Sequence, residues 1–168
     1  MPDDDRRRNS LRYPGYDYSQ AGAVFVTICT QGRQRLFGTV RDGRVVLTLP
    51  GRRARDRWAQ VPARFPGVLI DVFIVMPDHI HGIIVTGTDP TLPTQSTTSD
   101  VVRWFKSAMF SDYTTGVRQH GWAPYDRQFW QRNYYDHIIR NEREMNRIRQ
   151  YIEGNPARWE ARASVTDM

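Results

Sequence analysis

The chain of 168 residues is poor in cysteine, in lysine and in long apolar runs, and each scarcity excludes a class of protein. Its one cysteine, Cys29, excludes an internal disulfide framework, and its place in an apolar run predicts a buried structural role. No run approaches the roughly 18 to 20 apolar residues that a membrane-spanning helix needs. Residues 1–8 carry charges with no apolar segment after them, unlike a secretory signal. We therefore expect a cytoplasmic protein of bacterial type with no membrane partner.

The scarcity of lysine means that arginine supplies nearly all of the positive charge. Lysine and arginine together number 24 against 18 acidic residues, which gives a formal net charge of +6. Arginine binds phosphate through two parallel hydrogen bonds and stacks on bases, so this bias favours a nucleic-acid partner. A DNA partner would associate the protein with the nucleoid.

The length and apolar content, 39% of the residues, suit one compact domain. We expect this domain to cover residues 11–160, after a disordered tail at 1–10 and before a C-terminal tail at 161–168. Patterns typical of strands cover residues 23–30, 45–47, 68–75 and 82–86, and patterns typical of helices cover residues 50–60, 100–118 and 141–154. Their order is not the regular alternation of a parallel sheet. It predicts an α+β fold, an antiparallel sheet with helices packed mainly on one face.

Two histidines, His79 and His81, follow the apolar strand expected at 68–75. Because a strand alternates its side chains, both imidazoles leave the same face while Ile80 points to the other. Two neutral imidazoles side by side can bind one divalent cation through their nitrogen lone pairs. The spacing alone equally fits two polar residues at an exposed strand end. Asp78, just before the pair, could orient an imidazole, but its place after Pro77 explains it as a turn residue.

The last expected helix places a phenol and an amide on one ridge. Met145, Ile148 and Ile152 recur at i, i+3 and i+7 and predict a buried stripe. Tyr151 and Asn155, four residues apart, lie together along the border of that stripe. Taken alone, Tyr151 also fits a ring packed at the edge of the core, and Asn155 also fits a helix C-cap.

Several segments in a fixed order and spacing resemble a known family. These segments are residues 11–18, 25–30, 75–84, 105–107, 129–142 and 151–156. The chain resembles the single-tyrosine HUH transposases and, among them, the REP-associated tyrosine transposases of bacteria, over roughly residues 11–160. The resemblance implies a ferredoxin-like fold and a metal-dependent endonuclease and strand transferase.

The resemblance also implies a role for each part of the site. Tyr151 is the expected nucleophile, which would form a 5′-phosphotyrosine with single-stranded DNA beside REP-like or transposon-end hairpins. His79, His81 and Asn155 are the expected ligands of Mg²⁺ or Mn²⁺. A homodimer is compatible with the family, so Tyr151 could serve the histidines of its own chain or of a partner.

Further side chains are candidates for DNA contact, because cationic groups bind phosphates and aromatic rings stack on unpaired bases. Most of the aromatic residues are nevertheless expected in the core. The candidates are Arg12, Tyr16, Arg103, Lys106, Arg132 and Arg147.

Some residues keep alternative interpretations. Tyr134 and Tyr135 are rival nucleophiles, although their segment is typical of a strand and loop before the last helix. His137 could be a ligand or base, but a structural hydrogen bond explains it better. Asp71 stays unassigned. Strand alternation puts it on the face of Phe73 and Val75, but the turn after Val75 prevents that register from being carried to His79.

Two other functions are compatible with the same parts. One is a DNA-hairpin-binding protein that does not cut, although the intact set of histidines, tyrosine and asparagine argues against it. The other is a metal hydrolase that activates water and forms no covalent link to DNA.

Overall fold

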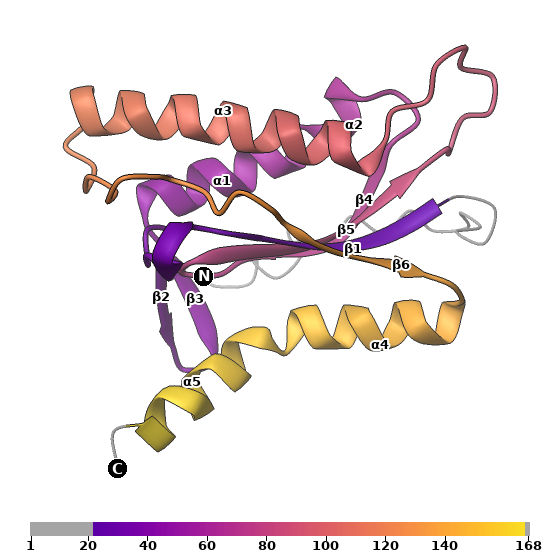
Figure 1. The fold of residues 1–168 in the computed structure, drawn as a ribbon. Coiled ribbons are helices and arrows are strands. Elements are labelled where there is room, and N and C mark those ends of the chain that lie inside the picture. Colours follow the sequence, from indigo (N-terminus) through magenta and orange to yellow (C-terminus); the bar gives the residue numbers. More distant parts are fainter. Residues whose placement is uncertain (1–21, 167–168) are drawn as a thin grey trace, which may run out of the picture.

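A four-stranded sheet lies at the centre of the computed structural model, which describes residues 22–166 of the chain (Figure 1). Every neighbouring pair of strands is antiparallel, so the predicted antiparallel sheet is confirmed. In spatial order the strands are β4 (Leu69–Val75), β5 (His79–Thr86), β1 (Gly22–Cys29) and β6 (Tyr135–Ile139).

Helices cover the two faces of this sheet unequally (Figure 1). On one face, α1, α2 and α3 bury an aromatic core around Trp58, Phe73 and Phe105. On the other face, α4 packs through Met145 and Ile152. The predicted α+β fold is confirmed, and α4 supplies a cover for the second face. The bounds are α1 (Leu49–Ala59), α2 (Val61–Arg64), α3 (Thr98–Gln119) and α4 (Glu142–Glu153).

The alternation of side chains along the central strands builds both cores. Val26 and Ile28 of β1 join the core beneath α1 and α3, while Phe25 joins the core beneath α4. Strand β5 is buried on both faces along nearly its whole length. Gly82 of β5 lies under Trp58, and a Cβ at this position would come within 2.7 Å of the indole. Glycine is therefore the residue that lets α1 approach the sheet here.

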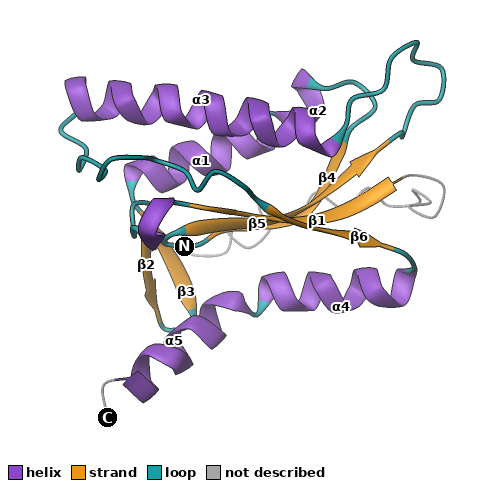
Figure 2. Cartoon of the chain, viewed as in Figure 1, coloured by secondary structure: helices purple, strands orange, loops and turns teal. Residues whose placement is uncertain are grey.

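A separate hairpin and a last helix flank one end of the sheet (Figure 2). The N–H groups of Asp42 and Gly43 at the hairpin tip donate to the carboxylate of Glu160 at 3.0 and 2.6 Å. Both tip residues have positive φ, as the favoured two-residue hairpin turn requires. The hairpin therefore holds the last helix. These elements are β2 (Gly38–Arg41), β3 (Arg44–Leu47) and α5 (Asn155–Thr166), and a short 3-10 helix, η2 (Gln31–Arg33), follows β1.

The start of β5 differs from the prediction. The ladder between β1 and β5 extends to the pair Cys29 and His79, so β5 begins at His79 and not at residue 82. Both histidines are therefore inside a strand, where their orientation is set by the sheet.

The last part of the chain also differs from the prediction. Gly154 ends α4, and Asn155 begins α5 directly, so Asn155 is not the C-cap of the preceding helix. Helix α5 then continues through residues 161–166, which were expected to be a tail. Pro156 does not prevent this, because proline is well tolerated in the first turn of a helix.

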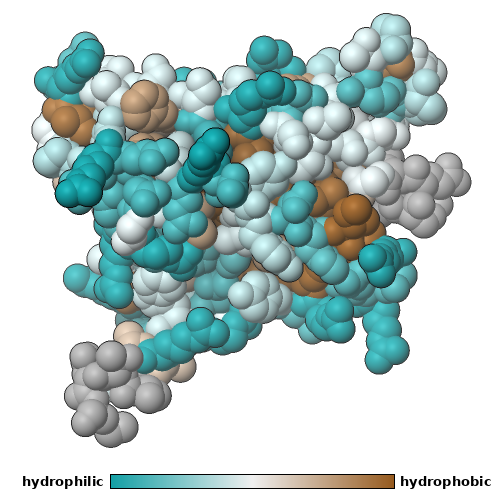
Figure 3. All heavy atoms as spheres, in the orientation of Figure 1, coloured by the Kyte–Doolittle hydropathy of each residue, from teal (hydrophilic) through white to brown (hydrophobic). Residues whose placement is uncertain are grey.

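Three of the predictions concern the N-terminal residues or the surface of the protein. The tail at 1–10 and the DNA-contact candidates Arg12 and Tyr16 lie outside residues 22–166. Within these bounds, no helix is long and apolar enough to cross a membrane. The face shown in Figure 3 is mostly hydrophilic with separate apolar patches.

Candidate functional site

The two histidines of β5 form the centre of the site. Their ring centroids lie 4.4 Å apart, and the side chains share the face of the sheet that α4 covers, as strand alternation predicts. His79 is 4% exposed and His81 is 6% exposed, so the alternative of two solvated polar residues at a strand end is wrong. The pair is held inside the protein with its orientation fixed.

A hydrogen bond orients each imidazole. The Nδ1 atom of His79 lies 2.6 Å from Oδ1 of Asp78, and Nδ1 of His81 lies 2.8 Å from Oγ1 of Thr27. Because a carboxylate can only accept, Nδ1 carries the proton in neutral His79 and its Nε2 keeps a lone pair. Asp78 is therefore more than a turn residue, since such an outer partner fixes a ligand's ring and tautomer.

Burial keeps His81 neutral. Desolvation, followed by smaller effects of His79, Arg33 and Arg158, lowers the pKa of His81 from 6.5 to about 3. Near neutral pH this imidazole is unprotonated and can offer a lone pair. The positive neighbours also make the surroundings of His81 favourable for an anion.

Tyr151 reaches the histidines from α4. Its ring centroid lies 5.6 Å from that of His81, and its ring contacts Phe25 edge-on at 6.1 Å. The side chain is 43% exposed, so the ring borders the core and is not enclosed by it. Ile152, the next residue, is fully buried, which shows why the helix turns Tyr151 to the edge.

These side chains line one small hollow of about 170 Å³. It unites the four residues singled out for catalysis and metal binding, and adds others that the sequence analysis did not find. Its lining residues are Thr27, Arg33, His79, His81, Tyr151, Asn155, Arg158, Trp159 and Arg162. Three of the added residues could have been predicted from their spacing: Arg158, Trp159 and Arg162 follow Asn155 at i+3, i+4 and i+7, as residues on one face of a helix do. The sequence analysis expected the helix to end before them.

Arg158 packs directly on Tyr151. Its Cζ atom lies 4.4 Å from the centroid of the phenol ring, and its guanidinium donates to the backbone carbonyl of Tyr151. The side chain crosses Gly154, where a Cβ would come within 2.8 Å of the guanidinium. The corner between α4 and α5 thus brings a cation to the face of the phenol.

Arg33 supplies a second cation from η2. It forms an ion pair with Asp78 at 3.0 Å, lies 3.4 Å from Nδ1 of His79, and donates to Sγ of Cys29 at 2.7 Å. Cys29 is only partly buried, so the expected buried role for this cysteine is wrong. Its side chain lies next to His79 across the ladder and contacts Arg33 there.

Two of the DNA-contact candidates belong to α3, on the opposite face of the sheet. Arg103 is exposed and pairs with Asp100 at 2.6 Å. Lys106 donates to two backbone carbonyls of residues 131 and 132, and burial lowers the pKa of its ammonium group. Neither side chain lines the hollow with Tyr151.

The other two described candidates are also outside the hollow. Arg132 is exposed in the segment before β6, and Arg147 is exposed on α4, 3.7 Å from Glu144. A role of these arginines in contacting DNA beyond the site stays a prediction.

The rival residues have other contacts. The hydroxyl of Tyr134 lies 2.9 Å from that of Ser99, at the start of α3. Tyr135 is 60% exposed on β6 and does not line the hollow. His137 contacts Glu144 at 2.6 Å, which is the predicted structural hydrogen bond.

The donor atoms fit a divalent cation with a partly open coordination shell. Two neutral imidazoles and one amide oxygen leave positions for water or phosphate oxygens. No group of three or more His, Cys, Asp or Glu side chains suited to a metal occurs within residues 22–166, and an amide oxygen is another type of donor that such a cation accepts. Asn155, 8% exposed and lining the same hollow, carries such an oxygen.

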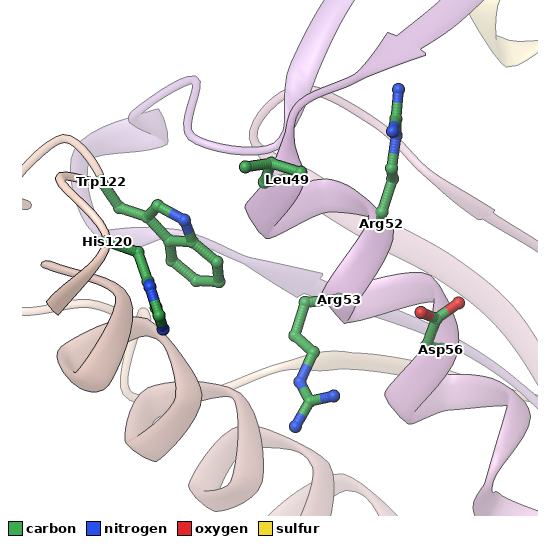
Figure 4. A pocket seen from close by; sticks show the side chains of 6 residues that line it. All are labelled: Leu49, Arg52, Arg53, Asp56, His120 and Trp122. Atoms are coloured by element: carbon green, nitrogen blue, oxygen red, sulfur yellow. The ribbon is translucent and has the colours of Figure 1, made fainter.

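A second hollow lies between α1 and the end of α3 (Figure 4). Leu49, Arg52, Asp56, His120 and Trp122 line it together with Arg53. Arg53 points toward α3 and is bound to Asp112 there. The Asp56 carboxylate pairs with Arg55 at 3.5 Å, and no cluster of His, Cys, Asp and Glu suited to a metal occurs within residues 22–166, so this hollow indicates no chemistry.

Comparison with a family model shows the family to which the chain belongs, and two further comparisons show a relative and a similar fold. Residues 58–155, more than half of the chain, match the family described as IS200-like transposases. An uncharacterized protein of Haemophilus influenzae is 34% identical over 172 residues, which cover 91% of this chain and 90% of the relative. A solved structure of a REP-associated tyrosine transposase bound to a REP hairpin is 22% identical, with a TM-score of 0.58 over 89% of this chain and 73% of that chain. This last similarity shows the same fold.

Proposed function

Because the chain belongs to the family of IS200-like transposases, we propose that it cuts and rejoins single-stranded DNA with Tyr151 as the nucleophile. The observation that carries the proposal is the meeting of Tyr151, His79, His81 and Asn155 in one hollow. The phenol is exposed enough for a DNA strand to approach, while the two imidazoles are buried and oriented. Such a pairing of an accessible nucleophile with a fixed site suits phosphoryl transfer.

A DNA hairpin with an adjoining single strand is the proposed substrate. The solved structure with the same fold is described as bound to a REP hairpin, and we extend that substrate class to this chain. The arginines Arg33, Arg158 and Arg162 line the site and suit a phosphodiester backbone. Cleavage would place the single strand across this hollow.

His79, His81 and Asn155 would hold Mg²⁺ or Mn²⁺. The imidazole nitrogens favour Mn²⁺ over Mg²⁺, which prefers oxygen ligands. When bound, the cation supplies charge neutralisation of the scissile phosphate. Asp78 and Thr27 keep the two Nε2 atoms facing the site, so the protein's own contribution is orientation.

The reaction exchanges one phosphoester for another. The Tyr151 oxygen forms a bond to phosphorus, the bond from phosphorus to the 3′ oxygen breaks, and the phenol's proton is balanced by the one that the 3′ oxygen gains. The products are a free 3′-hydroxyl and a 5′-phosphotyrosine. Since bond types are conserved, a second 3′-hydroxyl can reverse the step and join strands without a nucleotide cofactor.

A denaturing gel tests this function directly. The protein is incubated with Mn²⁺ or Mg²⁺ and a labelled oligonucleotide that carries a hairpin and a single-stranded flank. We expect a covalent protein–DNA adduct from the wild type, none from Tyr151→Phe, and none in EDTA. Tyr135→Phe, an exposed tyrosine outside the hollow, is the matched control and should form the adduct normally.

The same gel separates the two alternative functions. Hairpin binding without cleavage by the wild type would indicate a binding protein that does not cut. Cleavage without an adduct would indicate a hydrolase that uses water. An adduct formed by Tyr151→Phe would contradict the assignment of the nucleophile.

A further inference from the structure

A buried ion pair joins α4 to the sheet behind the site. The guanidinium of Arg149 donates to both carboxylate oxygens of Asp71 on β4, with Nε and one terminal nitrogen each at 2.8 Å. The Asp71 side chain is fully buried, and that of Arg149 is 6% exposed. Arg149 also reaches Asn146 and Glu142 of its own helix at 2.9 and 3.3 Å. The pair is therefore a two-point contact of fixed geometry between helix and sheet.

A β-bulge aims Asp71 at α4. Between the pairs Ile70 with Ile84 and Phe73 with Gly82, β4 has two residues and β5 has one. Asp71 therefore does not share a face with Phe73, and the expectation from simple alternation is wrong. Val72, beside it, packs in the core beneath α4. The bulge thus directs two consecutive side chains to α4, one apolar and one charged.

Stability alone does not explain this pair. Removing two charges from water costs several kcal/mol per ion, and well-packed apolar residues in place of a buried pair often stabilise a protein as much or more. The apolar stripe of α4 already buries Met145 and Ile152 against the sheet. Apolar contacts, however, are non-directional and tolerate sliding and rotation of a helix. A two-point ion pair does not.

We propose that Asp71 and Arg149 are positioning residues that fix α4 so that Tyr151 and Asn155 meet the histidines. This inference rests on the proposed function of Tyr151. Arg149 lies two residues before Tyr151 on the same helix, so a displacement of the helix at Arg149 moves the phenol as well. A slip of one residue would shift the helix by about 1.5 Å and rotate it by about 100°. Even a misplacement of about 1 Å can cost about 100-fold in rate.

The double variant Asp71→Leu with Arg149→Met tests the proposal, because it removes the directional contact and keeps the buried volume. We expect a melting temperature close to that of the wild type and hairpin affinity within about twofold. We expect the single-turnover rate of adduct formation to fall by at least about tenfold. Undiminished adduct formation by this variant would overturn the proposal. Arg149→Lys, which keeps the charge but not the two-point contact, should show a smaller fall in rate and decides the matter if the double variant does not fold.

A control and a second readout separate positioning from general effects. Asp112→Leu with Arg57→Met removes an ion pair of α1 and α3 on the other face of the sheet, and should leave the adduct rate unchanged. Nuclear Overhauser contacts between the rings of Tyr151 and His81, recorded without DNA, report the same geometry without chemistry. We expect these contacts in the wild type and a loss or weakening in the double variant; their full retention would contradict positioning. If the wild type forms no adduct, the proposed function fails, and the ring contacts alone decide whether the ion pair sets the geometry.

Discussion

The two faces of the sheet are built for different purposes. Beneath α1, α2 and α3, the core cluster unites twenty buried residues, and its largest members are aromatic. Beneath α4, the cluster unites eight buried residues and gives way to the hollow with His79, His81 and Tyr151. Since apolar burial is the main source of stability, the first face should dominate folding. The second face has fewer buried apolar residues and, in their place, polar groups with fixed orientation.

Strand β5 contributes side chains to both faces of the sheet. In β5, Ile80 and Ile84 point to the large core while His79 and His81 point to the site. The large core therefore holds the backbone of the strand rigid from behind. A rigid support is what a site with two buried imidazoles needs, because the orientation of both rings must be fixed by the surrounding structure.

Trp58→Ala should destabilise the protein most. The side chain is fully buried, and its ring centroid lies 5.0 Å from that of Phe105 and 6.2 Å from that of Phe73. We expect a loss of about 3–5 kcal/mol in the free energy of unfolding, measured by urea titration. Trp58→Phe is the control and should cost less, because the indole N–H has no hydrogen-bond partner among the described residues. A variant that is fully stable but inactive would contradict the division between the faces.

Acid should destabilise the protein through the other face. The pKa of His81 is about 3 in the folded state against 6.5 in the unfolded state, so the unfolded chain binds more protons between these values. Stability therefore falls as the pH drops below 6.5, by about 2 kcal/mol between pH 7 and about pH 5. Urea titrations in EDTA at both pH values measure this fall.

His81→Gln should remove most of that acid sensitivity, since glutamine does not titrate. His120→Gln is the matched control, because His120 is exposed and lies by the other hollow. If His81→Gln keeps the full dependence on pH, the burial of His81 is not its cause.

The sequence predicts the fold better than the details of the site. Strand and helix patterns are strong where burial is periodic, and the order of elements sufficed for an antiparallel α+β fold. His79, His81, Tyr151 and Asn155 were predicted as site residues because their types and spacing resemble a family, and their roles stay a prediction. The structure brings all four to one hollow.

The residues that were missed depend on contacts distant in sequence. Thr27 reaches His81 across the ladder of β1 and β5, and Asp71 meets Arg149 only because of a bulge. The local sequence does not predict the bulge, because strand prediction assumes that side chains alternate without interruption along the strand. Arg158 was missed for another reason, because a glycine–asparagine–proline segment is typical of a helix stop and here joins two helices.

Thr27→Val should weaken the site with little effect on stability. The change keeps the shape of the side chain but removes the hydroxyl beside Nδ1 of His81. Loss of such an outer partner typically costs about 10–100-fold in metal affinity or activity. Isothermal titration with Mn²⁺ and the adduct assay measure it, and Thr86→Val, whose hydroxyl lies at the far end of β5, is the control. An unchanged Mn²⁺ affinity would mean that Thr27 does not orient the ligand.

Asp112→Asn should have the smallest effect, although this carboxylate accepts hydrogen bonds from two arginines. Arg53 and Arg57 of α1 donate to Asp112 of α3 at 2.8 and 2.6 Å; the arginine side chains are 44% and 25% exposed and that of Asp112 is 15% exposed, so water still reaches all three. Ion pairs so close to water contribute little, because solvent screens their attraction and the free side chains are well hydrated. We expect a loss of about 1 kcal/mol or less by urea titration, reduced further by salt, and an unchanged adduct rate. A large loss would show that the face with α1 and α3 depends on charge as well as apolar burial, and the division between the two faces would then be one of degree.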